Sequence, residues 1–128
     1  MAAAVLAEEP QVLVFDEPTS ALDPEGIREF YEMVGELNQK EGLTVIVAEH
    51  HLEAALPYAT EFVLMDQGEI ISSGDPEKVM RFMRKSHVYE EAIPDMYRAQ
   101  LELEEHGFTF KNPFLNVEAA KESIIHSF

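Results

Sequence analysis

The fold of this chain follows from Val12-Leu13-Val14-Phe15-Asp16-Glu17-Pro18-Thr19-Ser20-Ala21-Leu22-Asp23-Pro24. The first four residues are apolar and rich in β-branched and aromatic types, a composition typical of a buried strand. Pro18 cannot continue a strand ladder, and Asp23-Pro24 supplies an N-cap and a first-turn proline for a helix. The stretch therefore predicts a strand, a turn and the start of a helix, as in an open α/β sheet.

Two carboxylates, Asp16 and Glu17, end the predicted strand. Ligands of open α/β sheets bind at the carboxyl ends of the strands. A magnesium ion needs hard oxygen ligands, and one carboxylate beside phosphates is enough to hold it, so Asp16 fits that position. Glu17 can orient a water for in-line attack on phosphorus. A bare Asp-Glu pair also occurs where a strand simply ends, and the Pro-Thr-Ser-Ala-Leu-Asp-Pro that follows favours the functional interpretation.

A second strand carries the next candidate residue. Apolar residues at helical spacing predict a helix over 24–40, and Leu-Thr-Val-Ile-Val-Ala over 43–48 predicts a buried strand. Strand, helix and strand form a βαβ unit with parallel strands, which brings His50 to the sheet edge of the two carboxylates. Imidazole can donate to a phosphate oxygen or to a carboxylate. His51 is given no chemistry, because adjacent histidines point in different directions and a zinc site would need further ligands.

The remaining elements are predicted from periodicity and turn residues. Residues 61–72 indicate a strand, a turn at Gly68 and a second strand. Helices are predicted over residues 1–9, 52–58, 76–85, 92–106 and after Asn116. The helix over 92–106 is expected to open near Pro94, and the last helix to have Ile124 and Ile125 on its apolar side. An aromatic extended linker is expected over 108–114.

Composition limits the possible functions. The 128 residues suffice for one small domain, and the absence of cysteine excludes disulfides and thiolate metal sites. A net charge of −16 argues against nucleic-acid binding, which depends on Lys and Arg. No apolar run reaches membrane-spanning length and no secretory signal is recognisable, so we expect a soluble, cytosolic chain.

The stretch at 12–24 resembles the Walker B motif and D-loop of ATP-binding-cassette (ABC) ATPases. The resemblance implies that Asp16 is the magnesium-side aspartate, that Glu17 is the catalytic glutamate and that Asp23 is the D-loop aspartate at a nucleotide-bound dimer interface. By the same resemblance His50 is the switch histidine. The pattern Met-Asp-x-Gly-x-Ile-x-x-x-Gly-x-Pro that begins at Met65 is also similar to the family. The tail, with Pro-x-x-Tyr-Arg before a Leu-x-Leu helix, is similar to the energy-coupling-factor (cobalt, nickel or vitamin) branch.

The resemblance implies an α/β fold, a partial P-loop NTPase core with a β-hairpin and a helical tail. It divides the chain into residues 1–85, the C-terminal half of an ABC ATPase core, and 86–128, a helical extension. The expected cofactors are ATP and Mg²⁺. The expected partners are a second ABC ATPase subunit and transmembrane transporter subunits, with the chain peripheral on the cytoplasmic face of the cell membrane.

Three family motifs do not occur in the sequence: the phosphate-binding loop Gly-x-x-x-x-Gly-Lys-Ser/Thr, the Leu-Ser-Gly-Gly-Gln signature and the Q-loop. We therefore expect normal ATP binding to need a separate N-terminal half. A truncated gene product, a split gene complemented in trans and a deliberately shortened chain all remain open. A non-catalytic, partner-binding remnant is the alternative to an ATPase. An ATPase of the chromosome-maintenance or DNA-repair branch is disfavoured by the acidic charge and the lack of coiled-coil heptads.

Overall fold

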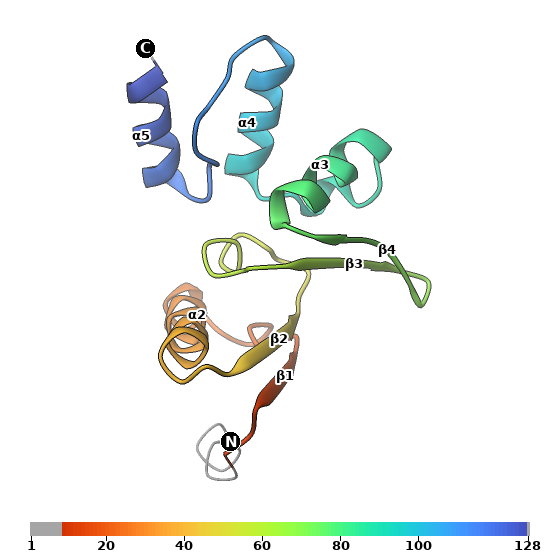
Figure 1. Cartoon of the computed structure of the whole chain (residues 1–128), viewed down its shortest axis with the longest axis vertical. Coiled ribbons are helices and arrows are strands. Elements are labelled where there is room, and N and C mark those ends of the chain that lie inside the picture. The colour runs from red at the N-terminus through yellow and green to blue at the C-terminus, as the bar shows by residue number, and fades with distance from the viewer. Residues whose placement is uncertain (1–8, 128) are drawn as a thin grey trace. The chain divides into compact units, whose positions relative to one another are not determined.

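The computed structural model describes residues 9–127, and the helix predicted over residues 1–9 lies almost entirely outside this range. Contacts divide the chain into two compact units, Met1–His50 and His51–Phe128, which are described separately. The chain has an α/β fold with a parallel strand pair, an antiparallel hairpin and a set of helices, as the sequence predicts (Figure 1). The domain boundary expected at residue 85 stays a prediction.

The first unit consists of strand β1 (Val12–Asp16), helix α2 (Pro24–Gln39) and strand β2 (Thr44–Ala48). The two strands are parallel neighbours, with Val12 opposite Thr44 and Asp16 opposite Ala48. This confirms the predicted βαβ unit.

Local sequence explains where α2 begins and which face it buries. The carboxylate of Asp23 caps the helix by accepting a hydrogen bond of 2.8 Å from the amide of Gly26. The predicted apolar positions face inward, with Tyr31 and Val34 buried. Phe30 also meets Phe15 of β1 edge-to-face, with ring centroids 5.2 Å apart, so α2 covers the sheet face that carries Phe15.

The second unit begins its regular structure with a β-hairpin, strands β3 (Phe62–Asp66) and β4 (Glu69–Gly74). The two-residue turn between them has positive φ at both positions, 49° at Gln67 and 79° at Gly68. This backbone is that of a type I′ turn, whose twist matches the flanking strands. The predicted hairpin is therefore confirmed.

Helices complete the second unit: α3 (Pro76–Ser86), the 3-10 turn η1 (Glu90–Ala92), α4 (Asp95–Glu105) and α5 (Val117–Ser127). Asp75 caps α3, and Asn116 caps α5 through a hydrogen bond of 2.8 Å from the amide of Ala119. The core is formed by seven buried side chains, with Phe62 and Leu64 of β3 packed against them: Leu56, Val79, Met80, Met83, Ile93, Tyr97 and Leu101. The hairpin therefore packs on α3, and α3 packs on the segment that leads into α4.

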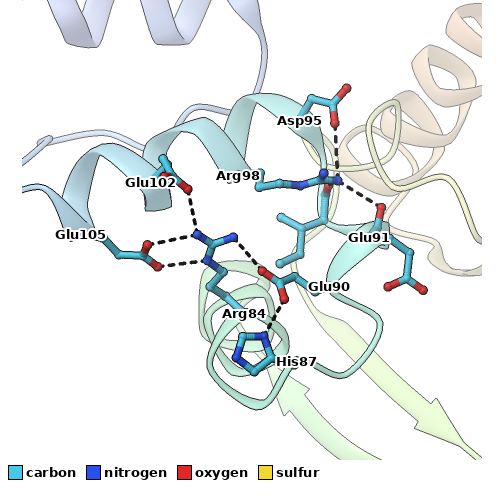
Figure 2. Close-up of polar contacts among 9 residues, drawn as sticks. Arg84, His87, Glu90, Glu91, Asp95, Arg98, Glu102 and Glu105 are labelled. Atoms are coloured by element: carbon cyan, nitrogen blue, oxygen red, sulfur yellow. Dashed lines mark hydrogen bonds and ion pairs between the residues drawn. The ribbon is translucent and has the colours of Figure 1, made fainter.

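Arg84 joins these helices through charge (Figure 2). Its guanidinium lies 2.7 Å from Glu90 of η1, 2.9 Å from Glu102 of α4 and 3.0 Å from Glu105 of α4. Hydrogen bonds with these carboxylates raise the pKa of Arg84 above its ordinary value, and the bond with Glu105 has the largest effect. His87 adds a contact of 2.8 Å to Glu90. One arginine on α3 therefore binds carboxylates from the two elements that follow it.

Proline decides the outcome of two helix predictions, one wrong and one confirmed. The helix expected over 52–58 is a series of turns, because Pro57 has no amide hydrogen and interrupts the run between the bonds Leu56 N–Leu52 O and Ala59 N–Ala55 O. The helix expected to open near Pro94 does so: α4 begins at Asp95, with Pro94 at the N-cap position. Pro94 restricts the residue before it to extended backbone, and Ile93 has φ −64° and ψ 127°.

The face of α5 is the second correction. The residues packed inward are Ala120 and Ser123, whereas Ile124 is 38% exposed and Ile125 is 70% exposed. Consecutive helical residues differ by about 100° in direction, so two neighbouring isoleucines cannot share one narrow stripe.

Candidate functional site

The candidate site lies at the carboxyl ends of β1 and β2, within the first unit. Glu17 directly follows β1, and its amide donates a hydrogen bond of 2.8 Å to the carbonyl of Ala48, the last residue of β2. Its φ of 46° is in the left-handed region, which a non-glycine residue adopts at a cost of roughly 1–2 kcal/mol. The backbone thus turns at Glu17 instead of continuing the strand.

Glu17 and His50 are in contact. Nε2 of His50 lies 2.6 Å from Oε1 of Glu17, although the two residues are 33 positions apart in the sequence. The side chain of His50 is 81% exposed and that of Glu17 is 51% exposed, so the pair is open to solvent and contributes little to stability. An imidazole at this distance can donate to the carboxylate and fix its direction.

Asp16 ends β1 opposite Ala48 and is exposed. Within residues 9–127 its carboxylate makes no hydrogen bond and no ion pair, so both oxygens are available to a ligand. Across the same range no group of three or more His, Cys, Asp or Glu side chains could hold a metal ion. A single free carboxylate at a strand end fits Mg²⁺, which is usually held by one or two carboxylates together with substrate phosphates and water.

Asp23 is the fourth residue predicted for the site, and its carboxylate caps α2 by accepting from the amide of Gly26. The predicted capping role is confirmed. Its predicted role at a nucleotide-bound dimer interface stays a prediction. His51, which was given no chemistry, is exposed.

Thr19 and Glu49 form a contact beside the site that was not predicted from the sequence. Oε1 of Glu49 accepts a bond of 2.7 Å from the Thr19 hydroxyl and one of 3.2 Å from the Thr19 amide. Thr19 is only 7% exposed. Strand alternation could have indicated the contact, because Val45, Val47 and Glu49 share the partly buried side of β2.

A buried phenol completes the surroundings of Glu49. Tyr31 of α2 is 3% exposed. Its burial, together with the negative charge of Glu49, raises the pKa of Tyr31 to about 12. The tyrosine is therefore neutral at physiological pH, and Glu49 lies within electrostatic reach of α2.

Crossing a membrane requires a helix that is both long and apolar. None of the described helices, over residues 9–127, is long and apolar enough to cross one.

Known proteins similar to this chain match almost all of it. No protein-family model matches. The chain is 39% identical over 125 residues to the energy-coupling factor transporter ATP-binding protein EcfA2 of Bacillus licheniformis. This match covers 95% of the chain and 43% of that protein. It is 38% identical over 123 residues to EcfA2 of Bacillus subtilis, and this match covers 95% of the chain and 45% of that protein.

A solved structure agrees with these sequences. CbiO1 from Clostridium perfringens, described as part of the ABC transporter complex CbiONQ, matches with a TM-score of 0.56 and 33% identity. The match covers 70% of this chain and 40% of that chain. The chain thus spans less than half the length of each of these three proteins.

Proposed function

Because this chain is related over 95% of its length to the ATP-binding proteins of ABC transporters, we propose that its first unit supplies the hydrolytic part of an ATPase site. The observation that carries the proposal is the separation of 2.6 Å between Glu17 and His50 at the carboxyl edge of two parallel strands. Such an edge is where open α/β sheets bind their ligands.

Each residue has a distinct role in the proposed reaction, the transfer of the γ-phosphoryl group of ATP to water. Glu17 orients the attacking water, and His50 holds the Glu17 carboxylate and donates toward the γ-phosphate. Asp16 binds Mg²⁺, which when bound neutralises charge on the phosphates. Asp23 acts near a second ATPase subunit across the nucleotide.

The phosphate-binding loop belongs to a different stretch of polypeptide, since no Gly-x-x-x-x-Gly-Lys-Ser/Thr occurs in this sequence. Catalysis of phosphoryl transfer is nearly all positioning and charge stabilisation, so this chain alone should hydrolyse ATP negligibly. Together with a separate N-terminal half that carries this loop, the chain would form the energy-coupling subunit of a transporter. Its transmembrane partners would hold it at the cytoplasmic face of the membrane.

Complementation tests the proposal. The purified chain is mixed with the segment of a relative that bears the phosphate-binding loop, and Mg²⁺-dependent ATPase activity is measured. Glu17→Gln should lower the restored kcat by roughly 10²–10⁴-fold while nucleotide binding persists. Glu29→Gln, a substitution on the exposed side of α2, is the matched control and should leave kcat unchanged.

Two results would count against this function. Turnover that survives Glu17→Gln would show that another group directs the water. Nucleotide binding by the mixture with no turnover at all would favour the alternative, a non-catalytic segment that binds a partner cassette.

A further inference from the structure

We propose that Glu49 and Thr19 are positioning residues of this site, which hold the turn after β1 against the end of β2 so that Glu17 and His50 stay in contact. The inference rests on the proposed function, and it adds two residues to which that function assigns no part.

Three contacts join the two segments in succession. The amide of Glu17 donates to the carbonyl of Ala48, the Glu17 carboxylate meets His50, and Thr19 donates twice to Glu49. Residues 17–19 therefore bind residues 48–50 through one backbone contact and two side-chain contacts. Of the two side-chain contacts, that of Thr19 with Glu49 is partly buried, whereas that of Glu17 with His50 is exposed.

Partial burial makes the contact of Thr19 with Glu49 the anchor of the two side-chain contacts. Thr19 is 7% exposed, whereas the side chains of Glu17 and His50 are 51% and 81% exposed. Hydrogen bonds to a carboxylate are about twice as strong as neutral ones, and partial burial protects them from competing water. An exposed pair such as Glu17 and His50 cannot by itself hold its geometry against solvent.

The backbone at Glu17 requires such an anchor. A left-handed φ at a glutamate persists only where the surrounding structure over-determines it. Thr19 lies two residues beyond this position, so fixing its amide and its hydroxyl fixes the direction in which the chain leaves Glu17. Tyr31 of α2 is buried nearby, and the negative charge of Glu49 adds to the effect of burial in raising the pKa of that phenol.

The first test uses the full chain without nucleotide and reads the contact of Glu17 with His50 directly. His50→Gln should shift the NMR signal of the Glu17 carboxyl carbon in the parent chain. In the Thr19→Val background, which removes the hydroxyl at constant shape, this response should fall by half or more. In the Thr19→Ser background, which restores the hydroxyl, it should return. A response of parental size in Thr19→Val would overturn the proposal.

Glu49→Ala removes the acceptor of both Thr19 bonds, from the hydroxyl and from the amide, and serves where Thr19→Val disturbs folding. Amide signals of β1, β2 and α2 show whether the unit remains folded. The double variant Thr19→Val/Glu49→Ala should reduce the response no further than Glu49→Ala alone, because Glu49→Ala already removes the bond that Thr19→Val removes. An additive loss would show that the two residues act separately and would contradict the proposal.

The second test uses the complemented ATPase. Displacement of a catalytic group by about 1 Å can cost 10²-fold, so Thr19→Val and Glu49→Ala should each lower kcat roughly 10–100-fold with little change in KM for ATP. Thr19→Ser should recover most of the loss. If Glu17→Gln abolishes turnover but these variants keep the parental kcat, the positioning role is wrong and the proposed function stands. If turnover survives Glu17→Gln, the proposed function itself is wrong.

Discussion

Nε2 of His50 lies 2.6 Å from Oε1 of Glu17, across the carboxyl ends of two parallel strands. The contact results from topology, because a crossover helix returns the chain in the same direction and aligns the ends of β1 and β2. Glu17 directly follows β1 and His50 lies close after β2, so the site edge is formed by this chain's own βαβ unit.

The two adjacent histidines make a matched pair for testing this contact. In the complemented ATPase, His50→Ala should lower kcat by roughly 10²-fold or more, since the Glu17 carboxylate loses its orienting donor. His51→Ala removes an imidazole one residue further along and should leave kcat unchanged. Equal losses in the two variants, measured by Mg²⁺-dependent phosphate release, would contradict the role of His50.

The hairpin turn gives a prediction about backbone strain alone. A Cβ added at Gly68 would meet no atom within 4 Å, so Gly68→Ala creates no clash, but its φ of 79° lies in the left-handed region. The variant should lose about 1–2 kcal/mol of unfolding free energy in urea. Gln67→Asn should act in the opposite direction, because asparagine tolerates positive φ better than glutamine. A neutral Gly68→Ala would show that the turn relaxes into another type.

Helix α3 offers a matched pair of core and surface positions. Met80 is fully buried, and Met80→Ala should cost about 2–5 kcal/mol because it leaves a cavity among Leu56, Tyr97 and their neighbours. Phe82, two residues along the same helix, is 37% exposed, and Phe82→Ala should cost clearly less. Urea unfolding followed by the amide signals of α3 and α4 measures both. Similar losses of unfolding free energy in the two variants would contradict the assignment of Met80 to the core and of Phe82 to the surface.

Local sequence was sufficient to predict the elements whose signals are local. The apolar runs of β1 and β2, the cap at Asp23 and the turn at Gly68 each specify structure within a few residues, and all were confirmed. The wrong helix prediction lies at Pro57, where a missing amide outweighs apolar periodicity, whereas Pro94 marked the start of α4 correctly.

The site was predictable only in part. The strand ends were recognisable from the sequence, and the parallel topology predicted that they would meet. Strand alternation places Glu49 on a partly buried side, but its partner Thr19 is 30 residues away, so no local pattern identifies the bond between them. The left-handed backbone of Glu17 is likewise set by tertiary contacts, because glutamate has no intrinsic preference for it.

An ion pair between α3 and α4 predicts a pH dependence. Arg81 binds both carboxylate oxygens of Glu104, at 2.7 and 3.2 Å, and this hydrogen bonding lowers the pKa of Glu104 below its ordinary value of 4.5. A lowered pKa in the folded state means that the stabilisation is complete above pH 4.5 and is lost as the pH falls through the folded pKa.

The difference in stability between the parent and Glu104→Gln should therefore be largest at neutral pH. It should shrink toward zero as the pH is lowered below 4.5. Urea unfolding of both chains at several pH values, at constant ionic strength, measures this difference. A difference that stays constant down to the acid range would show that the carboxylate charge does not contribute.

The outer face of the first unit's sheet gives the final prediction. Helix α2 covers the face of Phe15, while the opposite face presents Val12, Val14 and Ile46, which are 51%, 69% and 52% exposed. Apolar strands left uncovered in this way promote association between chains. The chain should therefore self-associate with rising concentration in sedimentation experiments. Val14→Lys, a change that places a charge at the centre of this face without touching the buried side, should shift the chain toward monomer. Ile125→Lys, at an equally exposed apolar position on α5, is the control and should leave the association unchanged; equal effects of both changes would show that net charge, and not this face, governs association.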